Sequence, residues 1–250
     1  MLNTTNHPPQ PIDFQPKSAL VIVAHPDDMD FYCSGLLAKW IVLGTIVNLL
    51  VFTAGEKGSQ KLLSATEAKK LAKIRKQEQL SSCQLLGINT TIFLDYPDGD
   101  LAFADKKALQ AEIVRAIRRF QPEVLLSHDP HNRHRRVHID HQTVGQLVLQ
   151  SAFPISQVVN CFPEQILQEQ LTPWQASKLL LFDTDLPNYY VDIASVLKLK
   201  QSLLRQHKSQ AYVFPDGPDN AIIYRNSKVG AKYNLHYAEE YLVIDLLEQH

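Results

Sequence analysis

The sequence has few of the features that mark disulfide-rich, membrane-spanning or nucleic-acid-binding proteins. Only three of its 250 residues are cysteines, and no CxxC pair occurs, so nothing indicates a disulfide scaffold or a cysteine-based zinc site. No apolar stretch reaches the ~20 residues needed to cross a membrane. With 25 basic and 26 acidic residues the formal net charge is -1, which gives no case for binding nucleic acid or a membrane surface.

The amino-terminal segment is polar and proline-rich, and it lacks the basic start and apolar run of a signal peptide. We therefore predict a flexible arm over residues 1–17 and one domain over residues 18–250. A chain with 45% hydrophobic and 20% charged residues is large enough to bury a substantial core. We expect a cytoplasmic protein, and we leave open whether it forms a homo-oligomer.

Short apolar runs alternate with stretches of helical spacing along the first half of the chain. The predicted strands are Ser18–Ala24, Thr45–Thr53, Thr90–Asp95 and Glu123–Ser127. The predicted helices are Met29–Leu43, Ser64–Leu86 and Lys106–Phe120. This alternation indicates βαβ units. We therefore predict the α/β class, with a Rossmann-like, mostly parallel sheet and helices on both faces.

The second half is less regular, and we predict an irregular carboxyl-terminal part within the same domain. Helices are expected over His138–Leu149 and Ser195–Gln206. Short strands are expected over Leu179–Asp183, Tyr189–Ile193 and Tyr241–Leu246. Loops are expected around residues 96–105, 129–137 and 210–236, and we predict that they select the substrate.

A histidine and two carboxylates directly follow the first predicted strand, in the run His25-Pro26-Asp27-Asp28. Ligands of open parallel sheets bind just beyond the carboxyl ends of the strands. An aspartate before a helix often serves only as its N-cap. Capping accounts for one aspartate, but it does not account for the histidine, the second aspartate or their position.

A second cluster, His138-Ile139-Asp140-His141, lies more than a hundred residues downstream. Its two histidines are three apart and share one face of a helix, so one could bind a metal while the other reaches the substrate. Two distant runs of His and Asp are what a catalytic zinc site needs, with about three protein ligands plus water.

Other basic side chains near the second cluster have simpler interpretations. His131 and His134 lie in a polar loop and are predicted to be solvated, because loops are normally exposed. His128 could line the site or be a hydrogen-bonded inner residue, and the sequence does not decide between them. Solvated faces, rather than an anion site, are also predicted for Arg118, Arg119, Arg133, Arg135 and Arg136, although an arginine near the pocket could hold a phosphate.

The paired motifs Ala24-His25-Pro26-Asp27-Asp28 and His138-x-Asp140-His141 resemble those of the PIG-L/LmbE-like N-acetylglucosamine deacetylases, a family of zinc hydrolases. The resemblance covers roughly residues 18–241. Weaker supporting pieces are Thr53-Ala54-Gly55-Glu56-x-Gly58, Arg75-x-x-Glu78, Leu86-Gly87, Leu94-Asp95-Tyr96-Pro97-Asp98-Gly99 and His207-x-Ser209-Gln210. The resemblance implies a zinc-dependent enzyme that removes the N-acetyl group from a small GlcNAc-type sugar or sugar conjugate.

The resemblance also implies a role for each matching residue. Zinc, or another divalent metal, would bind to His25, Asp28 and His141. The catalytic group would comprise Asp27 as general base, His138 as the residue that stabilises the oxyanion or protonates the leaving amine, and Asp140 as its orienting partner. Arg75 and Asp98 would hold sugar hydroxyls. Two positions depart from the family pattern, namely Asp30, where many members have Glu, and Ile139, where many have Pro.

The chemistry required for amide hydrolysis agrees with these residue types. It needs an activated water, a polarised carbonyl and a proton for the amine, and no serine-hydrolase GxSxG signature is present. One alternative is a metal-dependent hydrolase of another amide or ester on the same scaffold. Another is a non-catalytic sugar- or nucleotide-binding protein. The latter is disfavoured because GxGxxG is absent after the first strand and because Asp27 and His138 exceed what binding needs.

Overall fold

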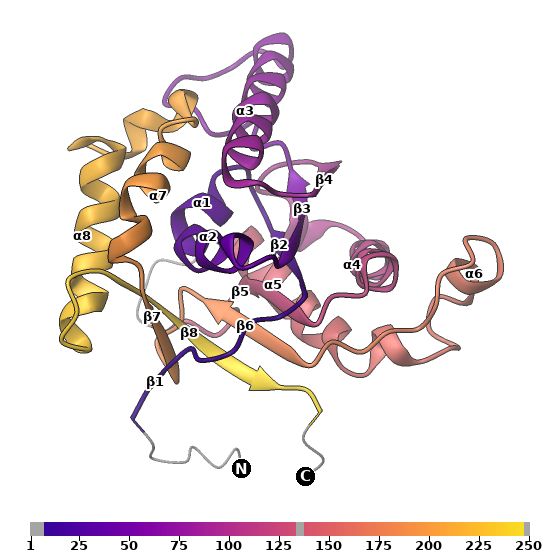
Figure 1. Ribbon diagram of the computed structural model, residues 1–250. Coiled ribbons are helices and arrows are strands. Elements are labelled where there is room, and N and C mark those ends of the chain that lie inside the picture. Colours follow the sequence, from indigo (N-terminus) through magenta and orange to yellow (C-terminus); the bar gives the residue numbers. More distant parts are fainter. Residues whose placement is uncertain (1–7, 134–137, 248–250) are drawn as a thin grey trace.

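A computed structural model describes residues 8–133 and 138–247 of the chain (Figure 1). The strands are β1 Gln10–Pro11, β2 Ser18–Val23, β3 Ile46–Thr53, β4 Thr90–Tyr96, β5 Val124–His128, β6 Lys178–Phe182, β7 Tyr189–Asp192 and β8 Ala238–Asp245. The α-helices are α1 Asp28–Tyr32, α2 Ser34–Val42, α3 Ala65–Leu86, α4 Lys106–Phe120, α5 Ile139–Ala152, α6 Pro163–Leu167, α7 Leu197–Leu204 and α8 Gly217–Lys232. Short 3₁₀ turns are η1 Leu101–Phe103, η2 Ile155–Gln157, η3 Ala194–Val196 and η4 Lys208–Val213.

The strands form an eight-stranded sheet in the order β1-β7-β8-β6-β5-β2-β3-β4. The segment from β6 to β4 is parallel throughout, whereas β8 runs antiparallel to both β6 and β7. The predicted mostly parallel α/β sheet is therefore confirmed. Strand order reverses between the neighbours β2 and β5, and such a switch point is where open parallel sheets bind ligands.

Alternation along β2 divides the interior into two cores. Ala19, Val21 and Val23 face the core beneath α1, α2, α3, α7 and α8, whereas Leu20 and Ile22 face the core beneath α4 and α5. Figure 1 shows these two helical layers on opposite faces of the sheet. Because both faces are covered, β2 is a continuous apolar run rather than an alternating one.

Two helical regions differ from the sequence-based expectation. The helix expected over Met29–Leu43 is two helices, because Cys33 (φ -133°, ψ 2°) leaves the helical conformation between α1 and α2. Part of the loop expected over residues 210–236 is the helix α8. Its buried face includes Asn226 and Gly230, so the hydrophobic periodicity that would have revealed the helix is weak.

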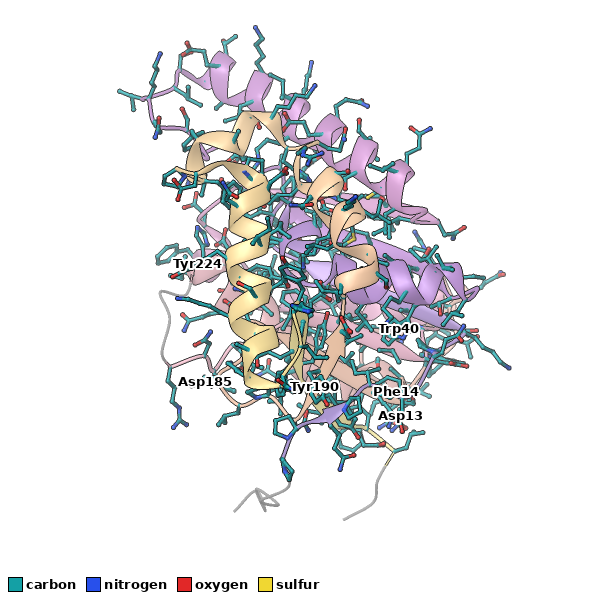
Figure 2. The ribbon with its side chains drawn as sticks, turned by 60° about the vertical axis from the view of Figure 1, so that its left-hand side comes forward. Asp13, Phe14, Trp40, Asp185, Tyr190 and Tyr224 are labelled. Carbon is teal, nitrogen blue, oxygen red and sulfur yellow. The ribbon has the colours of Figure 1, made fainter. Side chains whose placement is uncertain are left out.

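Part of the expected amino-terminal arm packs against the domain. Within residues 8–17, β1 pairs with β7, and the Phe14 ring lies 6.0 Å from the Trp40 ring. Figure 2 shows these two aromatic side chains together at one end of the molecule. The arm predicted for residues 1–17 therefore differs from the structure over residues 10–17, because Ile12 and Phe14 cover apolar surface of the core.

No helix among the described residues is both long enough and apolar enough to span a bilayer.

The amino-terminus of α2 is capped by a carboxylate from the opposite end of the chain. Cys33 provides no side-chain cap, and the first turn of α2 carries no acid. Glu239 of β8 instead accepts hydrogen bonds from the backbone N–H groups of Gly35 and Leu36, each at 2.8 Å. Lys200 and the Tyr241 hydroxyl donate to the same carboxylate at 2.5 and 2.6 Å.

We predict that Glu239→Gln costs about 3–5 kcal/mol of stability, because it leaves the buried Lys200 ammonium without its counter-charge. Lys200→Met should cost less, since Glu239 keeps its two backbone donors and the tyrosine. Urea unfolding of both variants measures the difference. A Lys200→Met variant that is destabilised as much as Glu239→Gln would contradict this account of the cap.

Candidate active site

The loop that follows β2 contains the first cluster and is clamped from the side by α3. Asp27 occupies the N-cap position of α1, but its side chain makes no capping hydrogen bond, so capping does not explain it. Arg75 of α3 donates to the Asp27 carboxylate at 3.0 Å and to the Pro26 carbonyl at 2.7 Å. These contacts leave 23% of the Asp27 side chain exposed.

The second cluster approaches the first from the amino-terminus of α5. His141 Nε2 lies 3.1 Å from His25 Nδ1 and 3.2 Å from Asp28 Oδ1, and His25 Nδ1 lies 3.5 Å from Asp28 Oδ2. A tetrahedral zinc site with bonds of about 2.0–2.2 Å separates its ligand atoms by roughly 3.3–3.6 Å. The predicted ligand atoms therefore stand at a spacing that fits a small divalent metal.

The other nitrogen of His25 faces two carboxylates. His25 Nε2 lies 3.1 Å from Asp98 Oδ1 and 3.3 Å from Asp140 Oδ2. Carboxylates only accept hydrogen bonds, so the proton of the neutral imidazole belongs on Nε2 and the Nδ1 lone pair points at His141 and Asp28. This is the arrangement that fixes the tautomer of a metal-ligating histidine.

Backbone N–H groups hold these two carboxylates in place. Asp140 accepts from Gly99 N at 2.7 Å and from Leu101 N at 3.1 Å, while Asp98 accepts from Lys57 N at 2.9 Å. The turn after β4 and the glycine-rich loop after β3 thus both contribute to orienting the His25 ring. Both loops follow strands that run parallel to β2, so they lie at the same edge of the sheet as His25.

His128, whose position the sequence left undecided, belongs to the same cluster of side chains. It ends β5, stacks on the His141 ring with centroids 3.9 Å apart, and places Nε2 3.3 Å from Asp28 Oδ2. A Cβ built at Gly145 of α5 would stand 2.4 Å from the His128 carbonyl oxygen. Only glycine therefore lets α5 come close enough for this stack. His128 is a hydrogen-bonded inner residue next to the predicted ligands.

Burial and charge perturb the ionisable groups in opposite directions. Burial opposes a charged His25, but hydrogen bonds to Asp140, Asp28 and Asp98 outweigh it and raise the pKa of His25 well above its ordinary value. Burial likewise opposes ionisation of Asp28, yet the neighbouring His141 and His128 lower its pKa well below the usual range.

The remaining pKa shifts separate the predicted catalytic groups. Burial raises the pKa of Asp27 even though Arg75 opposes the rise. Burial lowers the pKa of His128 to about 4 and also lowers the pKa of His138, which is further depressed by His25. For Asp98, burial opposes ionisation, but the hydrogen bond and charge of His25, together with the Lys57 N–H and Arg75, lower the pKa to about 2. Two neutral histidines thus stand beside carboxylates of differing basicity, a pattern typical of active sites.

A cavity of about 410 Å³ opens over these groups, large enough for a small ligand. It is lined by His25, Asp27, Asp28, Lys57, Gly58, Arg75, Asp98, Gly99, His138 and His141. The predicted site residues therefore all border this cavity except Asp140, which lies fully buried behind His25.

One predicted contact is not formed by the side chain expected to make it. The Asp140 carboxylate makes no hydrogen bond with the His138 ring in the described part of the chain, because His138 is the N-cap of α5 and Asp140 turns toward His25. The two residues are joined instead through the backbone, because the Asp140 N–H donates to His138 Nδ1 at 3.1 Å.

Two surface assignments have different outcomes. His131 is exposed, as predicted, whereas Arg118 is 1% exposed and donates to backbone carbonyls around Ser156, Val158 and Cys161. The Arg118 prediction is wrong because helix spacing alone does not show that a loop folds over the side chain. His134, Arg135 and Arg136 lie outside the described residues.

Sequence reasoning also missed Gln79 of α3, whose Oε1 accepts from the Asp27 backbone N–H at 2.8 Å. Gln79 lies four residues after Arg75 and therefore on the same face of the helix. This spacing could have indicated that Gln79 also faces the site.

Known proteins resemble this chain in sequence and in structure. The family described as "PIG-L: GlcNAc-PI de-N-acetylase" matches residues 20–152, just over half of the chain. The diacetylchitobiose deacetylase of Thermococcus kodakarensis is 30% identical over 200 residues, covering 80% of this chain and 71% of that relative. The 4-oxalmesaconate hydratase of Pseudomonas putida is 34% identical over 125 residues, covering 46% of each chain.

The fold is likewise shared with a solved structure of the N,N'-diacetylchitobiose deacetylase from Pyrococcus horikoshii, complexed with its inhibitor MPG. That structure superposes with a TM-score of 0.83 at 28% identity, covering 92% of this chain and 84% of that one. Family, sequence and fold agree with the resemblance expected from the two His/Asp motifs. The chain belongs to the PIG-L family, the family of GlcNAc-PI de-N-acetylase.

Proposed function

We propose that the protein is a metal-dependent hydrolase that removes the N-acetyl group from a GlcNAc-type sugar or sugar conjugate. The observation that carries the proposal is the convergence of His25 Nδ1, Asp28 and His141 Nε2 within 3.5 Å of one another, beside the partly exposed carboxylate of Asp27. The named deacetylases among its relatives support the same chemistry.

A divalent metal would be held by His25, Asp28 and His141, with Zn²⁺ the ion that best suits two imidazoles and one carboxylate. When bound, such an ion polarises a carbonyl as a Lewis acid and lowers the pKa of a coordinated water to about 7. The charge balance of the pocket supports a cation there. Buried carboxylates outnumber the permanent cation Arg75, and unbalanced buried charge is costly.

Neighbouring side chains would orient the metal ligands through hydrogen bonds. His128 is neutral at ordinary pH and can donate its Nε2 proton to Asp28, because that nitrogen faces the carboxylate. Asp98 and Asp140 orient His25 in the same way. Ligand-orienting partners of this kind usually affect metal affinity 10–100-fold.

Asp27 would serve as the general base. Its carboxylate reaches the cavity and its pKa is raised by burial, so it can take a proton from the attacking water. As the water oxygen bonds to the acetyl carbon and the C–N bond breaks, the same carboxyl can return that proton to the amine. Acetate and the free amino sugar are then the two products.

His138 would donate a hydrogen bond to the oxygen of the reacting carbonyl. Its Nδ1 already accepts from the Asp140 backbone N–H, so the proton of the neutral ring lies on Nε2. Because its pKa is lowered, a neutral donor is favoured over an imidazolium that protonates the amine. Of the two roles that the resemblance allows, oxyanion stabilisation therefore has the better support.

Arg75 and Asp98 border the cavity, and a contact of either with sugar hydroxyls remains a proposal. Most of the Arg75 guanidinium is committed to Pro26, Asp27 and Gly55. Asp98 offers a carboxylate edge beside Lys57. A small acetylated sugar is the proposed partner, and cytoplasmic location stays a prediction.

A second candidate is hydration of a carbon–carbon double bond, which is supported by the match to the hydratase of Pseudomonas putida. Both reactions use an activated water and a base. The deacetylase candidate has the broader support, because the Thermococcus relative matches 80% of the chain against 46% for the hydratase.

An acetate-release assay separates these candidates. Zinc-loaded protein should liberate acetate and a free amine from N,N'-diacetylchitobiose or another GlcNAc conjugate, and chelation should stop the reaction. Loss of an unsaturated tricarboxylate such as 4-oxalmesaconate, without acetate release from any N-acetyl sugar, would favour the hydratase. Absence of both activities would favour a binding protein.

We predict that the purified protein binds about one divalent metal per chain, because three ligand atoms converge. His25→Ala, Asp28→Ala and His141→Ala should each lower metal content measured by plasma mass spectrometry. His131→Ala, in an exposed loop, is the matched control and should keep its metal. Full metal content in all three variants would contradict the assignment of these residues as ligands.

Asp27→Asn should keep its metal and lose about 10²–10⁴-fold in turnover, which is the usual contribution of a general base. The amide is isosteric but cannot take the proton. Metal content and steady-state kinetics measured on the same preparation test this. Loss of metal together with activity would indicate that Asp27, rather than Asp28, is a ligand.

His138→Ala and Asp140→Asn should fail in different ways. His138→Ala should lose about 10²–10³-fold in turnover with metal retained, as expected for a lost oxyanion donor. Asp140→Asn should instead weaken metal affinity about 10–100-fold, because its carboxylate orients His25. Metal titration and kinetics of both variants decide the matter, and an Asp140→Asn variant with normal metal affinity would contradict the His25 contact.

A further inference from the structure

The peptide plane between Pro26 and Asp27 keeps the proposed base in an unfavourable conformation. Asp27 has φ 92° and ψ -24°, in the left-handed region that residues with a Cβ occupy only at a cost. A half-turn of this plane would bring φ to about -90°, an ordinary right-handed value. The observed state therefore requires groups that prevent the plane from turning.

Two side chains of α3 hold that plane at both of its polar ends. Arg75 Nη2 donates to the Pro26 carbonyl at 2.7 Å, and Gln79 Oε1 accepts from the Asp27 N–H at 2.8 Å. The two side chains are four residues apart and share a helical face. Gln79 is 0% exposed, so water does not compete for this hydrogen bond.

The orientation of the Gln79 amide is fixed by Asp30. Gln79 Nε2 donates to Asp30 Oδ2 at 3.1 Å, and a carboxylate can only accept. The amide oxygen is therefore directed at the Asp27 N–H, which can only donate. Asp30 also accepts from the Ser82 hydroxyl and from His207 Nε2, each at 2.7 Å, and all four side chains of this group are buried.

The segment that carries His207 is itself tied to α3 and to the cavity wall. Ser209 donates from its backbone N and its hydroxyl to Glu78 at 2.8 and 2.7 Å. Gln210 donates to the carbonyl of Gly58, which lines the cavity, at 3.1 Å. These are the motif pieces Arg75-x-x-Glu78 and His207-x-Ser209-Gln210, whose purpose the reaction alone leaves unexplained.

We propose that Gln79, oriented by Asp30 and His207, is a positioning residue that keeps Asp27 left-handed and so directs its carboxylate into the cavity. Gln79 touches no substrate and acts only through the Asp27 backbone. The inference rests on the proposed function, in which Asp27 takes the proton of the attacking water.

Gln79→Met removes both hydrogen bonds at similar volume. We expect kcat to fall about 10–100-fold, the usual effect of misplacing a reacting group by an ångström, while KM and metal content stay near wild type. A crystal structure of the variant should show Asp27 at negative φ. Gln77→Met, exposed on the same helix, is the matched control and should leave kcat unchanged.

Gln79→Glu distinguishes positioning from packing. A neutral carboxyl has the shape of the amide, and its C=O can accept from Asp27 while its O–H donates to Asp30. Facing a carboxylate in a buried group, the introduced carboxyl is favoured in its protonated form. Positioning therefore predicts a higher kcat for Gln79→Glu than for Gln79→Met. A packing role predicts the reverse, because methionine suits a buried slot better than a carboxyl does.

A left-handed Asp27 in crystals of Gln79→Met, or a Met variant that turns over faster than the Glu variant, would overturn the positioning role. If Gln79→Met does not fold, Gln79→Asn, whose amide is too short to reach both partners, takes its place with the same expected result. A wild-type protein that releases no acetate would overturn the proposed function alone. The φ of Asp27 in the variant would still decide the role of Gln79.

Discussion

The imidazole of His25 is held between carboxylates on both sides, and the rest of the site depends on this arrangement. Asp98 and Asp140 face Nε2, while Asp28 and His141 face Nδ1. Burying so much negative charge is unfavourable unless donors and cations compensate for it. Backbone N–H groups supply part of the compensation. The remaining negative charge favours a divalent cation, the occupant that we propose for this site.

The order of the strands in the sheet brings these groups together. His25 follows β2 and His128 ends β5, and these neighbouring strands flank the point where strand order reverses. The segment after α5, residues 153–247, contributes support rather than predicted ligands. It supplies Glu239, which caps α2, and His207, which completes the shell of Asp30 beneath α1. Distant partners therefore hold both short helices: His207 lies 177 residues after Asp30 of α1, and Glu239 lies 204 residues after Gly35 of α2.

Much of the fold and part of the site could be predicted, because those parts depend on local patterns. The run from β2 into His25-Pro26-Asp27-Asp28 is contiguous, and the rule for strand ends placed it on the functional rim. The contact of Asp140 with His25 could not be predicted, because it depends on the exact course of the turn that supplies Gly99 N. Helix α8 was missed because its buried face includes Asn226 and Gly230.

The central claim is that the metal lies on the Nδ1 side of His25, between Asp28 and His141. Alternative groupings exist in the described residues, namely His25 with Asp98 and Asp140, His128 with Asp28 and His141, and His25 with His138 and His141. Anomalous diffraction at the zinc edge, from crystals soaked in Zn²⁺, distinguishes them directly. The account predicts one strong peak about 2 Å from His25 Nδ1, from His141 Nε2 and from a carboxylate oxygen of Asp28. A peak beside His25 Nε2, between Asp98 and Asp140, would contradict it.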